Sequence, residues 1–265
     1  MDDLKRSAQV RRPQDSGAVT SLASQALSEL ARKRANRDER IMAALTEKLE
    51  AAVLDRNPHR RIAVLAEMRA EGIADTVIAE TCIPEVARRL GDAWCEDHMS
   101  FADVTIGSAR LQAMVRDLGG PDPEDGRTQG GRVAVIVTGD ETHTLGAMVL
   151  TNQLRRLGIS VRLILGKDEA SVIPILAECD FDAIMISASH SEKLVSLGNF
   201  VEKIRRGVPS QTPIIVGGSV VERGNDVLKR TGADYATTNV HEALQLCGLT
   251  TTDTQPSGRL KAMAE

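Results

Sequence analysis

Residues 133–146 read VAVIVTGDETHTLG, and this stretch decides the fold of the second half of the chain. The run from Val133 to Val137 is continuously apolar, which is typical of a strand buried on both faces. A polar loop follows it, and a helical pattern begins at Leu145. A strand, a loop and a helix in this order predict the first unit of a parallel α/β sheet.

The same alternation continues toward the C-terminus. Further strands are expected at residues 161–165, 183–186, 213–216 and 233–236. Helices are expected at 145–157, 168–179, 194–204 and 242–247, with one more after the fourth strand that ends at residue 229. Asp168 is suited to cap one of these helices. Residues 132–248 therefore predict a doubly wound, flavodoxin-like α/β domain with a five-stranded parallel sheet. Its ligand should lie outside the carboxyl ends of the strands.

The first half of the chain predicts only helices. One helical pattern starts at Val19, a second follows Asp38, and a third covers residues 62–72 after a break at Asn57-Pro58. Two more are expected, one starting at Pro84 and one over residues 101–118. Residues 37–118 thus predict an all-α bundle, and residues 1–36 a basic, partly disordered extension that contains a helix.

A linker separates the two halves. Residues 119–131 read GGPDPEDGRTQGG, which is rich in glycine, proline and acidic residues and lacks apolar periodicity. Such a composition favours an exposed connection, so the domain boundary is placed there. Residues 249–265 are expected to form a tail.

Charge and composition exclude several classes of protein. The net charge of −4 divides into +4 over residues 1–61 and −8 over the remainder, which argues against broad binding to nucleic acid and leaves DNA contact only to the basic N-terminus. No run approaches the ~20 apolar residues of a membrane helix, and the N-terminus lacks the apolar stretch of a signal peptide. A cytoplasmic protein without a membrane partner is expected. The four cysteines form no CxxC pair, so reduced thiols are expected rather than a zinc site built on them.

The loop after the first strand carries the candidate ligands. His143 lies where a doubly wound fold exposes its functional groups, and its imidazole can ligate a transition metal. Glu141 could hydrogen-bond the other ring nitrogen and raise the basicity of the ring. Gly146, in the first turn of the next helix, suggests that something approaches the backbone closely. Taken alone, a loop histidine is more often an ordinary surface residue.

Small residues follow two other strands. Ser187-Ala188-Ser189 comes after the third strand and Gly217-Gly218 after the fourth. Together they would leave a slot along the edge of the sheet, although glycine and serine are also common in ordinary turns.

Glu141-x-His143-x-x-Gly146 resembles the [DE]xHxxG motif of B12-binding domains. The resemblance implies cobalamin as the cofactor, His143 as its lower axial cobalt ligand and Glu141 as the partner of that histidine. It also implies that Ser187, Ser189, Gly217 and Gly218 line the nucleotide tail. The family often has Ser-x-Leu where this chain has Ser-x-Ser, which weakens the assignment of Ser189. Haem is a competing tetrapyrrole, but it has no tail to fill such a slot.

The resemblance extends into the bundle. Trp94, followed by Ser100-Phe101-Ala102-Asp103-Val104-Thr105, is similar to the helical cap of many B12 proteins, which implies that Trp94 covers the upper face of the corrin. His98 is a further candidate, as an upper ligand. Adenosylcobalamin-dependent photoreceptors show Trp-x9-Glu-His, and the corresponding residues here are Val104 and Thr105. Hydroxocobalamin or another upper ligand is therefore expected before adenosylcobalamin.

Three functions fit a B12-binding domain. The cap resembles that of the cobalamin-dependent antirepressors of photosynthesis genes in purple bacteria. This implies a non-enzymatic, light-responsive regulator whose partner is a transcriptional repressor. The alternative is a corrinoid carrier subunit of a methyltransferase. A DNA-binding photoreceptor fits least, because residues 1–36 are too short for a winged helix-turn-helix.

Overall fold

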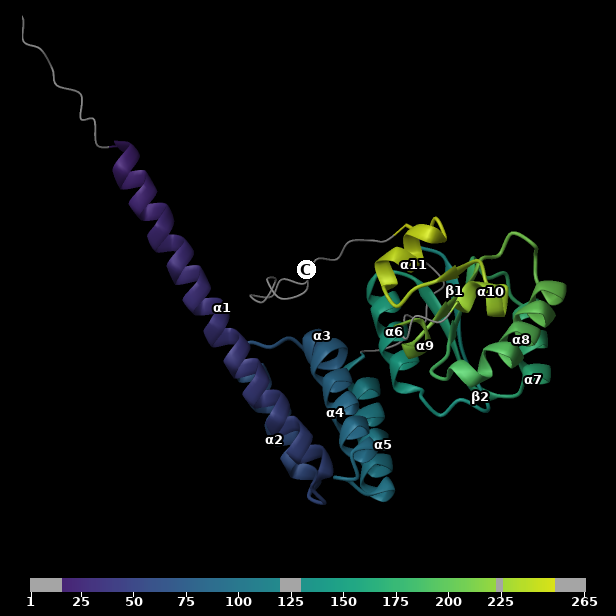
Figure 1. Cartoon of the computed structure of the whole chain (residues 1–265), viewed down its shortest axis with the longest axis horizontal. Coiled ribbons are helices and arrows are strands. Elements are labelled where there is room, and N and C mark those ends of the chain that lie inside the picture. The colour runs from purple at the N-terminus through teal and green to yellow at the C-terminus, as the bar shows by residue number, and fades with distance from the viewer. Residues whose placement is uncertain (1–15, 120–129, 223–225, 251–265) are drawn as a thin grey trace, which may run out of the picture.

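The structure of the chain is a computed structural model that describes residues 16–119, 130–222 and 226–250. It consists of a helical bundle followed by an α/β domain with a five-stranded parallel sheet (Figure 1). The predicted fold class is therefore confirmed. Residues 1–15, most of the predicted linker and most of the predicted tail lie outside the described residues.

The bundle has clear helix boundaries. Its elements are α1 (Ser16–Leu54), α2 (Pro58–Ala70), α3 (Asp75–Val77), the π-helical turn η1 (Ile78–Cys82), α4 (Ile83–Cys95) and α5 (Phe101–Leu118). Asn57 caps α2 by accepting a hydrogen bond from the backbone N–H of His59, with Pro58 as the first helical residue. Ser100 caps α5 by accepting from the N–H of Asp103.

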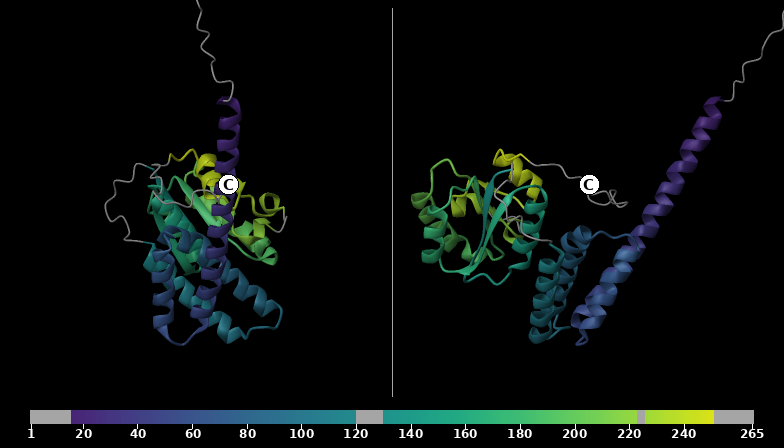
Figure 2. Two further views of the ribbon diagram at one scale, coloured as in Figure 1. Left: turned by 90° about the vertical axis from the view of Figure 1, so that its left-hand side faces the viewer. Right: turned by 180° about the vertical axis from the view of Figure 1, so that it is seen from behind.

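The two helices expected before and after Asp38 are one continuous helix, so that prediction is wrong. Residues 31–40 contain no glycine or proline, and their alanines and long charged side chains are good helix formers. Burial starts only in the second half of α1, at Leu45, Leu49 and Val53. The first half of α1 extends past the bundle, as Figures 1 and 2 show.

The helix expected to start at Pro84 instead begins at Asp75, as α3, and runs through η1 into α4. The π turn explains why proline is tolerated there. The N–H of Ile83 bonds to the carbonyl of Ile78, five residues back, so the hydrogen-bond ladder is already widened just before Pro84. A residue that cannot donate an N–H costs less at such a place than inside a regular helix.

The sheet has the strand order β2-β1-β3-β4-β5, and all its pairs are parallel. Its strands are β1 (Arg132–Thr138), β2 (Ser160–Lys167), β3 (Ala183–Ser187), β4 (Ile214–Gly217) and β5 (Tyr235–Ala236). Each of them overlaps an expected strand. After β2, the following strands are added on the other side of β1. As a result, β1 and β3 are neighbours in the sheet although β2 separates them in sequence.

Helices cover both faces of the sheet (Figure 2). One core holds residues from α7 (Glu169–Ala177), α8 (Leu194–Gly207) and α10 (Val227–Thr231). The other holds residues from α6 (Leu145–Arg156) and α11 (Val240–Leu246). The short helices η2 (Ser191–Lys193) and α9 (Ser219–Glu222) complete the domain. Asp168 caps α7 as expected, by accepting from the N–H of Ser171.

The bundle packs against α6 of the α/β domain. Met148 and Val149 of α6 belong to the core of the bundle. Arg156, at the end of α6, forms an ion pair with Glu80 of η1 at 2.7 Å. None of the described helices is both long and apolar enough to cross a membrane.

Candidate functional site

The candidate site lies at the carboxyl ends of β1 and β3, the neighbouring strands at which the order of strands in the sheet reverses. Loops that leave two adjacent parallel strands in opposite directions open a crevice at the carboxyl edge of the sheet, which is the usual ligand site of such folds. The β1–α6 loop contributes Glu141 and His143, and the β3–η2 loop contributes Ser189 and His190. Tertiary structure thus joins side chains almost 50 residues apart.

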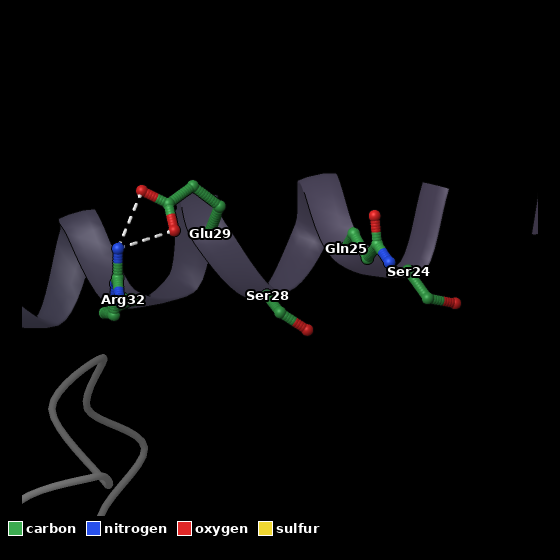
Figure 3. A pocket seen from close by; sticks show the side chains of 5 residues that line it. All are labelled: Ser24, Gln25, Ser28, Glu29 and Arg32. Atoms are coloured by element: carbon green, nitrogen blue, oxygen red, sulfur yellow. Dashed lines mark hydrogen bonds and ion pairs between the residues drawn. The ribbon is translucent and has the colours of Figure 1, made fainter. Parts of the chain in front are cut away.

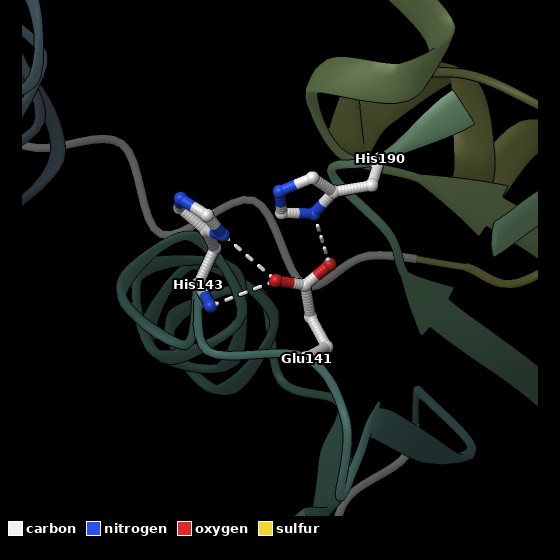
Figure 4. Close-up of side chains that lie close together, drawn as sticks. All are labelled: Glu141, His143 and His190. Atoms are coloured by element: carbon white, nitrogen blue, oxygen red, sulfur yellow. Dashed lines mark hydrogen bonds and ion pairs between the residues drawn. The ribbon is translucent and has the colours of Figure 1, made fainter. Parts of the chain in front are cut away.

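Glu141 is the centre of this cluster (Figure 4). Its side chain is only 3% exposed. Oε1 accepts from the backbone N–H of His143 at 2.9 Å and lies 2.8 Å from His143 Nδ1. Oε2 accepts from the backbone N–H of Ser189 at 3.0 Å and from its hydroxyl at 2.5 Å. The buried carboxylate therefore ties the two loops together.

These contacts keep Glu141 ionised. Burial alone would raise the pKa of its carboxyl, but the hydrogen bonds from the Ser189 hydroxyl, from the backbone and ring of His143 and from the backbone of Ser189 outweigh burial. They lower the pKa of Glu141 to about 2. A permanent negative charge thus lies beneath His143, where it can stabilise a metal-bound imidazole.

The network fixes the tautomers of both histidines. An ionised carboxylate only accepts hydrogen bonds, so Nδ1 of His143 carries the proton in its contact with Glu141. The single proton of the Ser189 hydroxyl goes to Glu141, so this oxygen accepts from Nδ1 of His190, 2.7 Å away. In the neutral form of each ring, Nε2 is then left with a free lone pair, and Figure 4 shows both outer nitrogens directed away from Glu141.

His190 is the residue that sequence reasoning missed. Its ring centroid lies 5.1 Å from that of His143, and its Nδ1 is 3.5 Å from Glu141 Oε2. The available signal was its position directly after Ser187-Ala188-Ser189, at the same edge as His143. Recognising it required knowing that β1 and β3 are neighbours in the sheet.

The predicted glycines and Ser187 differ in their surroundings. A Cβ at Gly146 would meet nothing within 4 Å, so the protein itself does not require glycine there. A Cβ at Gly217 would lie 3.1 Å from the carbonyl oxygen of Thr237. Gly218 has φ +92° and a Cβ there would lie 2.4 Å from the carbonyl oxygen of Ala188. Ser187 lines a small pocket beside the cluster, together with Thr138, Asp140, Glu141, Lys193 and Ser196 among others.

The residues predicted for the upper face of the corrin lie at the C-terminal end of α4 and in the turn that follows it. Trp94 is 46% exposed, and its ring centroid lies 6.1 Å from that of Phe101. His98 is exposed, with Nδ1 3.3 Å from Glu96, and Cys95 is exposed beside them. None of the contacts described for Trp94 or His98 reaches Glu141 or His143. The turn between α4 and α5 extends beyond the carboxyl edge of the sheet (Figure 1).

A shallow depression lies on the exposed half of α1. Figure 3 shows the five polar side chains that line it, with Arg32 paired to Glu29 at 2.8 Å. All five come from one helix, and they are Ser24, Gln25, Ser28, Glu29 and Arg32. A single helix cannot enclose a small ligand, so this depression is part of an open surface.

Comparisons with known proteins point to one family. The family model described as "B12 binding domain" matches residues 131–244. An uncharacterised 20.5 kDa protein from the bchF-crtJ intergenic region of Rhodobacter capsulatus is 32% identical over 176 residues, which cover 66% of this chain and 92% of that protein. The structure of the Methanosarcina barkeri monomethylamine corrinoid protein is similar with a TM-score of 0.62 at 16% identity, covering 77% of this chain and 97% of that one.

Proposed function

The chain belongs to the family of proteins with a B12-binding domain, and we propose that it is a cobalamin-binding regulator that acts through a transcriptional repressor. Binding of cobalamin by this domain follows from the family. The regulatory role, the protein partner and the roles of single residues are our proposal.

The residues at the carboxyl edge fit a corrinoid. His143 offers an Nε2 lone pair in a side chain that is 63% exposed, while its Nδ1 is held by a buried carboxylate. An imidazole with its second nitrogen bonded to a carboxylate is a common arrangement for a ligand to a transition metal. We therefore assign His143 as the lower axial ligand, Glu141 as the residue that orients it, and Ser189 as the residue that orients Glu141.

Cobalamin would supply a cobalt ion whose upper ligand can be exchanged or photolysed. The side of this ion opposite His143 would be left to the bundle, whose α4–α5 turn presents Trp94 and Phe101. Only five aromatic residues occur in the chain, and of these two Phe101 is 69% exposed and Trp94 about half exposed. Exposed aromatic rings with no core role are suited to cover a flat ligand. We propose Trp94 as this cover, and His98 as a candidate upper ligand.

The observation that carries the regulatory proposal is the free half of α1. From residue 24 to residue 40 none of the described side chains is buried. Five basic and three acidic side chains lie there, which leaves a net positive surface. A methyl carrier has no evident use for such a projecting helix, whereas a regulator needs a surface for its partner. The gene of the R. capsulatus relative lies in a photosynthesis gene cluster, which supports a repressor of such genes as the partner.

Signal transfer would require the bundle to move relative to the α/β domain. The contacts that would have to change are the Arg156–Glu80 ion pair and the hydrogen bond from Asn152 to the carbonyl of Val115, at 3.0 Å. Both lie along α6, which starts two residues after His143. Small-angle scattering with and without cobalamin, in darkness and in light, tests this movement. Identical curves would contradict it.

The absorption spectrum after gel filtration with hydroxocobalamin tests the cofactor site. We expect retained pigment in the natural protein and retention reduced by more than about 100-fold in His143→Ala, because even the outer partners of metal ligands contribute 10–100-fold. His59→Ala is the matched control, since His59 is an exposed histidine at the start of α2. Unchanged retention in His143→Ala would contradict the assignment of His143.

Repressor binding tests the regulatory role. Fluorescence anisotropy of operator DNA with a purified repressor of pigment genes should show weaker repressor–operator binding when cobalamin-loaded protein is added. The double variant Arg32→Glu/Arg37→Glu should lose this effect and keep its pigment, because both side chains lie on the free half of α1. Methyl transfer catalysed with a methyltransferase, and no effect on the repressor, would favour a corrinoid carrier instead.

A further inference from the structure

The cluster at the carboxyl edge contains more metal-ligating groups than the proposed cobalamin site uses. Glu141, His143 and His190 each offer one ligand atom, and these three atoms lie within 4.8 Å of one another. The cobalt role assigns Nε2 of His143 and leaves His190 without a function. The atoms that converge are instead a Glu141 oxygen and the Nδ1 atoms of the two rings.

Their spacing suits a small divalent ion. Zinc binds histidine nitrogen and carboxylate oxygen at roughly 2.0–2.2 Å, so donors around a tetrahedral ion lie about 3.3–3.6 Å apart. Here Nδ1 of His143 is 2.8 Å from Glu141 Oε1, and Nδ1 of His190 is 3.5 Å from Oε2. The Ser189 hydroxyl oxygen lies between the two rings, 3.0 Å from Nδ1 of His143 and 2.7 Å from Nδ1 of His190, so an ion would take the place of these hydrogen bonds. The outer sides of both rings face solvent, since the side chains are 63% and 41% exposed, which leaves room for the rings to shift around an ion.

The charge at the cluster also favours a cation. Glu141 is buried, ionised and held from two loops, so one ligand is already in place. The basic side chain nearest in sequence to His190, Lys193, lies 3.4 Å from the carboxylate of Asp140 and is thereby partly neutralised. One carboxylate and two imidazoles are a donor set that zinc accepts, with water as the fourth ligand.

We propose that, in the cobalamin-free protein, Glu141, His143 and His190 bind one Zn²⁺ ion, and that this ion and cobalamin exclude each other. The ion site stands on the contacts of the cluster alone. The exclusion rests on the proposed role of His143 as the cobalt ligand.

Exclusion follows from the tautomers of His143. Cobalt requires the lone pair of Nε2, which is available only while Nδ1 carries the proton and donates to Glu141. Zinc requires the lone pair of Nδ1, so the proton of a neutral ring moves to Nε2 through solvent. A protonated Nε2 has no lone pair to offer. The ring can therefore serve one metal at a time.

Zinc titration of the chelator-treated full chain, followed with a competing zinc indicator, tests the ion site. We expect one Zn²⁺ per chain, and binding weakened by at least about 100-fold in His190→Ala and in His190→Gln. His98→Ala is the matched control, because His98 also lies near a glutamate, with an exposed cysteine beside it. Circular dichroism of each variant verifies that it is folded.

Three results would overturn the ion site. They are no stoichiometric zinc in the natural protein, unchanged affinity in the His190 variants, or loss of zinc in His98→Ala in place of those variants. The last result would place the ion at the end of α4. X-ray absorption of the zinc-loaded protein should show nitrogen and oxygen ligands, and a sulfur ligand would contradict the proposal.

Loading with hydroxocobalamin in the presence and absence of equimolar Zn²⁺ tests the exclusion. Zinc should lower the retained pigment of the natural protein at least about tenfold. In His190→Ala the amount of pigment retained with zinc should nearly equal the amount retained without zinc, even if this variant retains less pigment than the natural protein. Bound zinc that leaves loading unchanged would overturn the exclusion. No pigment even without zinc would contradict the proposed function and the exclusion, while the titration alone judges the ion site.

Discussion

The carboxyl edge of the sheet and the α4–α5 turn of the bundle would face each other across a bound corrinoid, and they differ in how firmly their side chains are held. At the sheet edge, Glu141 is buried, and its carboxylate is hydrogen-bonded to His143 in its own loop and to Ser189 in the loop after β3. The tautomers of both histidines follow from these contacts. At the bundle end, Trp94 and His98 are exposed, and each has one side-chain neighbour among the described contacts.

If His143 and Trp94 hold the two faces of the corrin as proposed, the lower side of the site would be formed before the ligand arrives, whereas the upper side would take its final arrangement with the ligand. A preformed ligand set loses little conformational freedom on binding. Exposed side chains at the end of a helical hairpin are free to change with the upper ligand. Such an asymmetry suits a sensor, because the part that holds the cofactor can stay fixed while the part that reports on it moves.

The largest expected effect comes from Gly218→Ala, which tests how rigid the sheet edge is. With φ +92° and a Cβ 2.4 Å from the carbonyl oxygen of Ala188, an alanine forces the loops after β3 and β4 apart. We expect the free energy of unfolding, from urea titrations, to fall by about 3 kcal/mol.

Gly146→Ala is the control for this change. Nothing lies within 4 Å of a Cβ there, so the free energy of unfolding should stay unchanged or rise by up to about 1 kcal/mol, because alanine is the better helix former. Weaker retention of cobalamin at unchanged stability would then show that Gly146 is kept for the ligand. Equal stability losses in the two variants would contradict a rigid edge.

The next effect is the response of the sheet edge to acid. The pKa of Glu141 is lowered from 4.5 to about 2, so its stabilising contribution is complete above pH 4.5 and is lost as the pH falls toward 2. The shift corresponds to at most about 3 kcal/mol. The difference in unfolding free energy between the natural protein and Glu141→Gln should therefore be largest near neutral pH and shrink below pH 4.5.

Glu96→Gln provides the comparison at the bundle end, because Glu96 is 67% exposed and lies beside His98. Its unfolding free energy should follow that of the natural protein over the same pH range. A difference between the natural protein and Glu141→Gln that does not depend on pH would show that the hydrogen bonds to the carboxylate do not lower its pKa.

The smallest effect is expected at Trp94. Because this side chain is half exposed, Trp94→Ala should lower the free energy of unfolding by less than about 1 kcal/mol. If Trp94 covers the corrin, dissociation of cobalamin should be faster by about two- to tenfold in Trp94→Ala and nearly unchanged in Trp94→Phe, which keeps an aromatic ring.

Equal rates of cobalamin dissociation in the natural protein and in Trp94→Ala would contradict the role of Trp94 as a cover of the corrin. Fluorescence gives an independent measurement, since Trp94 is the only tryptophan of the chain. Its emission should be quenched when cobalamin binds, because a corrinoid beneath the ring accepts the excitation energy.

Several parts of the fold and site could be predicted because they depend on local patterns. The apolar run from Val133 to Val137 and the capping role of Asp168 required only the preferences of neighbouring residues. Continuity of α1 through Asp38 and the π turn before Pro84 were missed. At Asp38 the good helix formers on either side continue the helix, although only its second half is packed. Before Pro84 the packed segments on both sides continue the helix through the π turn.

The sequence by itself determined the two-part architecture, the succession of strands and helices along the chain and the pairing of Glu141 with His143, because each rests on residues close together in the chain. Only the tertiary structure decided that β1 and β3 are neighbours. That adjacency brings Ser189 and His190 onto the carboxylate of Glu141 and sets the tautomers of both rings. It is fixed by burial of apolar side chains on both faces of the sheet, which no short stretch of sequence specifies alone.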